Sequence, residues 1–244
     1  MKSQFDYVPR SFRLLPDRLK VVEASASPEE LRRALDIRKN FTFAGKAVPY
    51  MIDIVRAFRL ALGATTYLEI GIYDRGNLAY VSTLLSPDAW LIGVDVEANP
   101  EHDARLRSVL SAGQLYMPVI GDSRSADTFL KVQQALDGRK VDALFIDGGH
   151  DAQCVMSDYA KYSELVSDDG VILFHDALWE GNLEFKGVRH ALECIDKLDP
   201  VFTVIGSEGA QRYMPAMFVG EVWGCVGIVL PNMMAHRCPT VRSR

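Results

Sequence analysis

From Thr65 onward, short apolar runs alternate with longer segments of helical periodicity, and this alternation constrains the fold more than any other feature of the chain. The apolar runs predict strands near 66–71, 90–95, 116–120, 142–147 and 170–175. The intervals predict helices over 78–85, 102–111, 125–136, 152–165 and 188–198. Strands that return through helices run parallel, with right-handed crossovers. The pattern therefore predicts an α/β protein with an open, mostly parallel sheet and helices on both faces.

Two further apolar runs, 201–206 and 223–230, have no helical pattern between them. We expect them to pair antiparallel at one edge, which gives a sheet of seven strands with an antiparallel edge strand. Before the alternation, Ser27 and Pro28 resemble a helix start, so a helix is expected over about 28–39. The predicted parts are an N-terminal helical segment over 1–40 (a lid or dimer arm), a domain over 41–230 and a mobile tail over 231–244.

The overall charge and the cysteines restrict the partners and the compartment. The 244 residues carry a formal net charge of −5, which provides no basic surplus for a nucleic-acid backbone. The four cysteines contain no C-x-x-C spacing, so reduced thiols are expected rather than disulfides or zinc. The first residues lack a signal-peptide core, and no apolar run is long enough to span a membrane. We expect a cytoplasmic protein with no nucleic-acid or membrane partner; a homo-oligomer stays open.

The first three strands all end on polar residues. Glu69 and Gly71 lie at the end of the first strand, Asp95 ends the second, and Asp122-Ser123 follows the third. In a parallel sheet these ends lie at one edge, where a carboxylate can accept the hydroxyls of a ribose. Gly71 permits close approach to the backbone, but the spacing to Gly76 is not the G-x-G-x-x-G of a dinucleotide site. The set indicates a pocket for a positively charged nucleoside rather than for phosphates.

The next two strands end on groups that can carry out chemistry. Asp147-Gly-Gly-His150 follows one strand, and His175-Asp176 follows the other. If the two strands are neighbours, they lie roughly 4.8 Å apart, and Asp147 and Asp176 can share one ligand or one cation. His175 and Asp176 are consecutive, so both can face one site only where the chain is already turning.

These motifs together resemble the class I S-adenosylmethionine-dependent methyltransferases, over roughly residues 41–230. The Phe145–His150 and Ile172–Asp176 stretches are similar to the metal-dependent small-molecule O-methyltransferases, which include catechol O-methyltransferase, the rhamnosyl and macrolide sugar O-methyltransferases and the cephalosporin-hydroxylase-type family. The resemblance implies a Rossmann-like methyltransferase fold and S-adenosylmethionine as cofactor. It names no acceptor beyond a small molecule with a hydroxyl group, such as a sugar or another natural product.

The resemblance also assigns roles to individual residues. It implies that Gly71, Tyr73 and Asn77 lie by the methionine end of the cofactor, Asp95 on the ribose, and Asp122 and Ser123 by the adenine. Gly76 is a further cofactor-binding candidate in the same loop. It also implies that residues 43–45 close over the methionyl group. Glu69 either contacts the cofactor or only braces the glycine loop. Arg75 is a departure, because relatives usually have a small residue there, and it puts the shape of this loop in question.

At the reacting end, a divalent cation (Mg²⁺ or Mn²⁺) held by Asp147 and Asp176 would orient acceptor oxygens and lower their pKa. His150 is the candidate general base. His175 is either a third metal ligand, which suits Mn²⁺, Fe²⁺ or Zn²⁺ better than Mg²⁺, or a hydrogen-bonding residue.

Two other functions stay open at this point. In the first, His150, His175 and a carboxylate form the iron site of an oxygenase or hydroxylase. In the second, the chain is a catalytically inactive cofactor-binding protein that acts through a partner. The oxygenase reading leaves the acidic ends of the first three strands without a role. Candidates for the acceptor pocket are Trp179, Phe185, Tyr213, Met214 and Phe218.

Overall fold

The computed structural model describes residues 64–176, 186–198, 203–205 and 226–229, together with Asp36 and Phe41. The predictions for the N-terminal segment, the tail, residues 43–45 and the acceptor pocket lie outside the described residues. The strands are β1 (Thr66–Ile70), β2 (Trp90–Asp95), β3 (Leu115–Ile120), β4 (Val141–Ile146), β5 (Val166–Phe174), β6 (Thr203–Ile205) and β7 (Val226–Val229). The helices are α4 (Gly76–Ser82), α5 (Pro100–Arg107), α6 (Ala126–Leu136), α7 (Ala152–Tyr162), η4 (Ser163–Leu165) and α8 (Lys186–Leu198).

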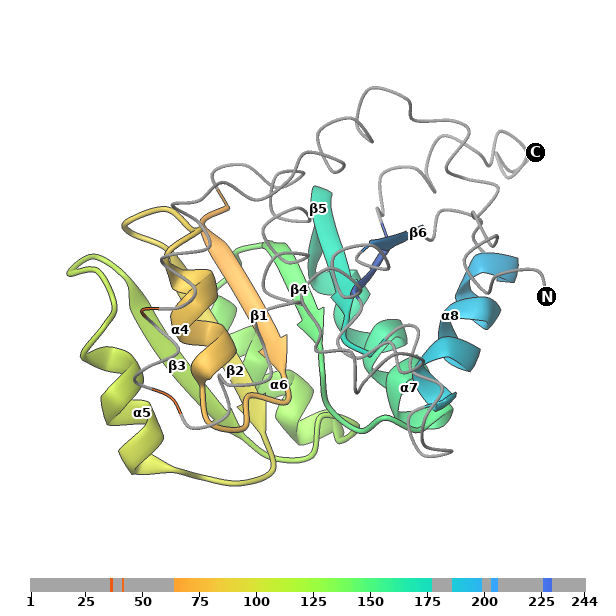
Figure 1. The fold of residues 1–244 in the computed structure, drawn as a ribbon, viewed down its shortest axis with the longest axis horizontal. Helices are drawn as coiled ribbons and strands as arrows, with labels where there is room; N and C mark the ends of the chain where they lie inside the picture. The colour runs from red at the N-terminus through yellow and green to blue at the C-terminus, as the bar shows by residue number, and fades with distance from the viewer. Residues whose placement is uncertain are drawn as a thin grey trace, which may run out of the picture.

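The strands form one sheet in the order β3-β2-β1-β4-β5-β7-β6 (Figure 1). β1 to β5 pair in parallel, as the alternation of strands and helices predicts. β7 runs antiparallel to both β5 and β6. The predicted antiparallel pairing at one edge is therefore confirmed, although the antiparallel strand β7 lies second from the edge and β6 is outermost. The strand order reverses between β1 and β4, because β2 and β3 lie on one side of β1 and β4 and β5 lie on the other. In α/β sheets such a reversal is the usual place for a ligand.

Alternate side chains of the central strands pack into two separate hydrophobic cores, one on each face of the sheet. On one face, Tyr67, Phe145 and Leu173 pack with residues of α4 and α5. On the other face, Leu68, Leu144 and Ile172 pack with residues of α6, α7 and α8, and Figure 1 shows the two groups of helices on opposite sides of the sheet. Strands covered on both faces are mostly apolar, which is why β1 and β4 are recognisable as apolar runs although they contain Glu69 and Asp142.

The helix starts follow from local hydrogen bonds. Asn99 precedes Pro100 and accepts the backbone N–H of His102, so α5 begins there. Ser125 caps α6 through the N–H of Thr128, and Asp151 caps α7 through the N–H of Cys154. Each cap satisfies a backbone N–H that a helix start leaves unpaired. These caps set where the loops after β2, β3 and β4 end, and those loops carry the candidate site.

β5 differs from its prediction at its start. It begins at Val166, and its register with β4 shifts between Val141, opposite Val166, and Ala143, opposite Val171. A strand was predicted only near 170, because Asp168, Asp169 and Gly170 are poor strand formers. The irregularity accommodates those residues, and beyond it the register is regular up to Ile146 opposite Phe174. The ends of β4 and β5 are therefore level, which places Asp147 beside His175.

Candidate active site

The loop after β1 packs directly against the loop after β4. Gly71 has a φ of +84° and donates its N–H to the carbonyl of Val94 at 2.8 Å. A Cβ on Gly71 would lie 2.1 Å from the carbonyl oxygen of Asp147, far inside van der Waals contact. Glycine is therefore required here for both its conformation and its size. The contact joins the predicted cofactor loop to the predicted metal-binding loop.

Asp95 shapes the same loop from the end of β2. Its Oδ2 accepts the backbone N–H groups of Ile72 at 3.1 Å and of Tyr73 at 3.0 Å, and its Oδ1 accepts that of Glu97 at 3.1 Å. Tyr73 has a φ of 35°, and its ring is 68% exposed. The carboxylate predicted to bind a ribose thus also holds the loop on which the cofactor would rest. Its Oδ2 already accepts two N–H groups, whereas Oδ1 accepts one and keeps a lone pair for a hydroxyl group.

Glu69 is buried below the loop, in a network that the sequence did not reveal. Its Oε2 accepts the hydroxyl of Tyr67 at 2.7 Å and the amide of Asn77, on α4, at 2.9 Å. Burial raises the pKa of Glu69 to about 8, and the nearby charge of Asp147 adds to the rise, although the two hydrogen bonds oppose it. The bond between Glu69 and Asn77 joins β1 to α4, the two elements that the loop connects. Contact of either residue with a cofactor stays a prediction.

Gly76 closes the loop at the start of α4. Its N–H donates to Oδ1 of Asp74 at 2.8 Å, and a Cβ at Gly76 would meet the side chain of Phe41 at 3.3 Å. Phe41 is buried in the core on the α4 side of the sheet. The Phe41 side chain therefore lies against Gly76, at the end of the glycine loop.

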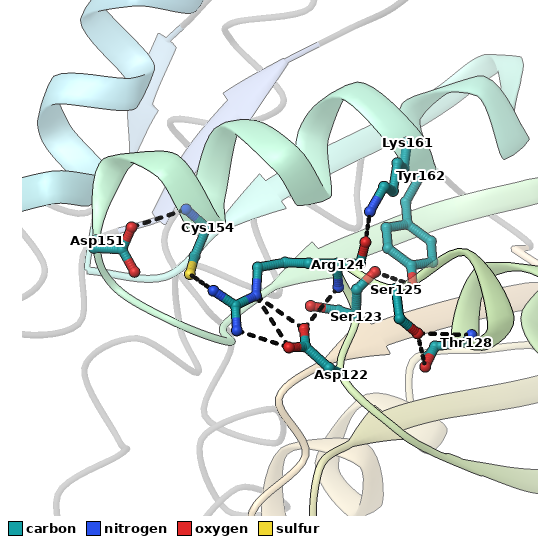
Figure 2. A network of polar contacts seen from close by, with 9 residues as sticks. All are labelled: Asp122, Ser123, Arg124, Ser125, Thr128, Asp151, Cys154, Lys161 and Tyr162. Atoms are coloured by element: carbon teal, nitrogen blue, oxygen red, sulfur yellow. Dashed lines mark hydrogen bonds and ion pairs between the residues drawn. The ribbon is translucent and has the colours of Figure 1, made fainter.

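The loop after β3 carries Asp122 and Ser123 and is held by α7. Figure 2 shows Arg124 folded back on Asp122, with Arg124 Nη2 2.7 Å from Oδ2 of Asp122 and Arg124 Nη1 3.5 Å from the sulfur of Cys154. These bonds from Arg124 lower the pKa of Asp122 to about 2. Tyr162 donates to the carbonyl of Ser123 at 2.9 Å, and Lys161 contacts that of Arg124. Asp122 is thus a fixed anion, although nothing in the sequence singled out Arg124 as its partner.

Asp158 is a buried acid that the sequence reasoning missed. It lies on α7 with no exposed surface, and burial raises its pKa to about 6, although the Ser123 side chain opposes the shift. A Cβ on Gly148 would lie 3.4 Å from its Oδ2. Asp158 therefore lies behind the loops after β3 and β4. Its signal was a polar residue on the core-facing side of α7, which Val155 and Tyr162 also occupy.

Four side chains converge at the ends of β4 and β5. His175 Nδ1 lies 2.9 Å from Oδ1 of Asp147 and 3.3 Å from Oδ2 of Asp176. His150 Nε2 lies 3.3 Å from the same Asp176 oxygen and 3.5 Å from Oδ1 of Asp147. β5 ends at Phe174, and Asp176 has a φ of 52°, so the chain is turning where His175 and Asp176 point to one place. The condition for both to face one site is met.

The charges in this cluster depend on one another. Burial alone would lower the pKa of His150, but its hydrogen bonds to Asp147 and Asp176 prevail and raise the pKa to about 9. For His175, burial is likewise outweighed by the negative charges of Asp147 and Asp176, and the pKa lies well above its ordinary value. Burial would raise the pKa of Asp176, but the neighbouring imidazoles lower it. Two anions therefore hold two imidazolium ions when nothing else neutralises them.

The donor set fits a divalent cation. Asp147, His150 and His175 each offer one ligand atom, all within 4.8 Å of one another. Asp176 lies within reach of both imidazoles. The set predicted from the sequence was Asp147, His175 and Asp176, with His150 apart as a base, whereas the structure brings His150 into the same cluster. Mixed imidazole and carboxylate ligands favour Mn²⁺, Fe²⁺ or Zn²⁺ over Mg²⁺.

Two other described histidines and the described cysteines lie away from this cluster. His102 lies on α5, and His190 is exposed on α8. Cys154 and Cys194 are free thiols, as expected, and the other two cysteines lie outside the described residues. No described helix has both the length and the apolar character needed to cross a membrane.

Comparison with known families finds a match over the same part of the chain. Residues 68–177 match the model of a family described as a methyltransferase domain. This span runs from β1 through Asp176 and includes every predicted cofactor and metal residue. The chain thus carries a methyltransferase domain, and the resemblance to methyltransferases is confirmed, whereas the narrower resemblance to the metal-dependent branch stays a prediction. An uncharacterised protein of Acanthamoeba polyphaga mimivirus is 24% identical over 177 residues, which cover 70% of this chain and 74% of that protein.

Solved structures share the fold at low sequence identity. An O-methyltransferase from Bacillus cereus, solved with S-adenosylhomocysteine, has a TM-score of 0.50 and 16% identity, covering 84% of this chain and 92% of its own. The O-methyltransferase TomG from Streptomyces achromogenes, solved with S-adenosylmethionine, has a TM-score of 0.52 and 15% identity, covering 88% and 95%. At such identities the likeness establishes the Rossmann-like methyltransferase fold alone.

Proposed function

We propose that this chain, which carries a methyltransferase domain, is an S-adenosylmethionine-dependent O-methyltransferase that acts with a divalent cation on a hydroxyl group of a small molecule. A sugar or another natural product is the acceptor class that its motifs favour. TomG is involved in tomaymycin synthesis, and this supports a natural-product acceptor only as an analogy between folds.

The observation that carries the proposal is that Asp147 belongs to two parts of the site, one through its backbone and the other through its side chain. Its backbone carbonyl lies against Gly71 in the loop after β1, while its carboxylate belongs to the cluster with His150 and His175. A cofactor bound on that loop would therefore lie next to the groups that can activate an acceptor. This adjacency is what a methyl transfer needs, because the acceptor oxygen must line up behind the methyl group.

At the cofactor end, S-adenosylmethionine supplies a methyl group on a positively charged sulfur. The chain presents acids rather than phosphate-binding groups to such a ligand. In this proposal Asp95, at the end of β2, accepts ribose hydroxyls, and Asp122, which pairs with Arg124 after β3, supplies a second acid. Glu69 and Asn77 keep the intervening loop in position from below. The roles of Asp95 and Asp122 toward the ligand are part of the proposal.

At the reacting end, a bound cation supplies positive charge that orients acceptor oxygens and lowers their pKa. Asp147 and His175 would hold it, together with His150 or Asp176. Without a cation, His150 carries a proton at neutral pH, since its pKa is about 9. It can take a proton from the acceptor only in its neutral form, which a neighbouring cation favours by the same electrostatics.

One observation favours a second candidate, an iron-dependent oxygenase or hydroxylase. Asp147, His150 and His175 form a two-histidine, one-carboxylate set, which such enzymes use. This candidate leaves Asp95, Asp122 and the glycine loop without a role, and the matched family is a methyltransferase domain. It is therefore the weaker of the two.

Calorimetry and a turnover assay separate the candidates. We expect S-adenosylhomocysteine to bind the purified protein, and a panel of sugar and catechol-like hydroxyl compounds to contain at least one that releases S-adenosylhomocysteine from S-adenosylmethionine. Turnover should stop in chelator and return with Mn²⁺ more effectively than with Mg²⁺. Absence of binding would refute the methyltransferase proposal. Binding without turnover on any acceptor would favour a non-catalytic cofactor-binding protein, and full activity in chelator would remove the metal.

A further inference from the structure

Arg75 occupies a position in the cofactor loop where a small residue is expected, and its side chain is almost completely buried, at 2% exposure. The guanidinium group extends to α5, where Nε donates to Oδ1 of Asp103 at 2.9 Å. The hydroxyl of Tyr116, on β3, donates to the same oxygen at 2.9 Å. Arg75 thus ties the cofactor loop to a helix and a strand outside the loop.

The same guanidinium also holds the backbone of Tyr73. Nη1 of Arg75 donates to the carbonyl of Tyr73, whose N–H donates to Asp95 at 3.0 Å. The backbone of Tyr73 is therefore held by two side chains: Asp95 accepts its N–H, and Arg75 donates to its carbonyl. Tyr73 and Arg75 also have left-handed φ values, 35° and 63°, which residues with a side chain rarely adopt without support.

The contact between Arg75 and the Tyr73 carbonyl depends on the ion pair with Asp103, because a buried cation must be paired. Asp103 and the carbonyl of Tyr73 are the partners of Arg75 among the described residues, and its Nη2 atom is buried without one there. Burial of the unpaired cation would be strongly unfavourable, so the guanidinium stays where these two acceptors are. The position of the Tyr73 peptide is therefore linked to that of Asp103 on α5.

We propose that Arg75, anchored by Asp103 and Tyr116, is a positioning residue that sets the 71–76 loop in its cofactor-binding conformation through the Tyr73 carbonyl. The inference rests on the proposed function, since it assumes that the loop receives S-adenosylmethionine. Arg75 itself does not contact the cofactor. If the ion pair only fastened α5 to the fold, its loss would change stability but not the affinity of the folded protein for a ligand.

The test measures affinity and stability separately. S-adenosylhomocysteine is titrated by calorimetry into wild type, Arg75→Gln and Asp103→Asn, well below the melting temperature of each. We expect both variants to bind about tenfold more weakly or worse, because the loop loses its preset shape. Arg75→Lys should restore part of the affinity, since it keeps the charge but not the forked geometry.

Two controls isolate the effect. Arg105→Gln makes the same charge change on α5, where Arg105 pairs with Glu101 at the surface, and should bind like wild type. Gln114→Ala removes buried hydrogen bonds to the carbonyls of Ser82 and Ser86, so it should melt earlier at unchanged affinity. Tyr116→Phe removes only one hydroxyl group and should weaken binding about threefold; it tests the inference if Arg75→Gln does not fold.

Wild-type affinity in folded Arg75→Gln, or in both Asp103→Asn and Tyr116→Phe, would overturn the inference and leave the proposed function intact. A wild-type protein that does not bind S-adenosylhomocysteine at all would instead overturn the proposed function, and the inference with it. The two failures are therefore distinguishable in the same set of titrations.

Discussion

The two ends of the candidate site are held together in different ways. At the cofactor end, acids are satisfied by nearby loop groups: Asp74 by the N–H of Gly76, and Asp122 by Arg124. At the reacting end, His175 pairs with Asp147 and His150 pairs with Asp176, all across the gap between β4 and β5. The cofactor end thus combines contacts within its loops with ties from Asp95 on β2 and from Arg75 to α5, whereas the reacting end exists only when two strands pair.

The difference has an electrostatic consequence. The carboxylates of the cofactor end have their hydrogen bonds in place before a ligand arrives. The reacting end brings two carboxylates and two imidazoles together, so its state depends on protons or on a cation. We expect the two ends to respond separately to mutation, pH and metal, except where Gly71 and Asp147 join them.

Gly71→Ala should have the largest effect, because Gly71 is where the cofactor end contacts Asp147 of the reacting end. The new Cβ would meet the Asp147 carbonyl at 2.1 Å at a positive φ, so the free energy of unfolding should fall by about 3–5 kcal/mol. S-adenosylhomocysteine and Mn²⁺ binding should both be lost. Gly138→Ala is the matched control: its φ is +78° with nothing within 4 Å of a new Cβ, so it should cost about 1 kcal/mol. Equal losses in chemical denaturation would mean that the junction does not constrain the site.

His150→Ala should lower turnover by roughly 10²–10⁴-fold, the usual share of general base catalysis, and leave S-adenosylhomocysteine affinity unchanged. Release of S-adenosylhomocysteine reports the rate, and calorimetry reports both ligands. Unchanged Mn²⁺ affinity would keep His150 as a base, whereas a drop of about tenfold or more would make it a metal ligand. Full turnover would exclude both roles. His190→Ala, at an exposed position on α8, is the control.

Glu69→Gln should change how stability depends on pH. The pKa of Glu69 is about 8 in the folded protein, above its ordinary 4.5. Its protonated form is favoured by folding, so its contribution is fully present below about pH 4.5 and is lost as pH rises through 8. Compared with wild type, Glu69→Gln should be flatter over this window and more stable near pH 8 by roughly 2–4 kcal/mol. Parallel stability curves from urea titrations would show that Glu69 is ionised throughout.

Asp95→Ala should weaken S-adenosylhomocysteine binding by about 1.5–3 kcal/mol, the range for lost hydrogen bonds to a charged group. Because the change is confined to the cofactor end, Mn²⁺ affinity should stay within about twofold. Asp127→Ala, which removes an exposed acid paired with Lys131 on α6, controls for the change in charge. Undiminished binding of S-adenosylhomocysteine would remove Asp95 from the site, and a parallel loss of Mn²⁺ would show that the ends are not separate.

The sequence located the strands and the polar residues at their ends, because both are local. Strands buried on two faces must be apolar, and the residues that leave the sheet stand out against them, as Asp95 and Asp147 do. The sequence also identified Arg75 as an unusual residue, but not the direction of its side chain. Tyr67 and Asp158 were missed, since a hydroxyl group in a strand and an acid in an amphipathic helix carry no motif.

What the sequence by itself determined is the α/β alternation, the order of the acidic strand ends and the set of donors that can bind a cofactor and a cation. Only the tertiary structure decided which of these groups meet. The register of β4 against β5 placed His150 among the metal-binding candidates, and Asp103 on α5 fixed the Arg75 side chain so that it also reaches the carbonyl of Tyr73. Such contacts join residues far apart in the chain, and their geometry depends on packing that no local pattern encodes.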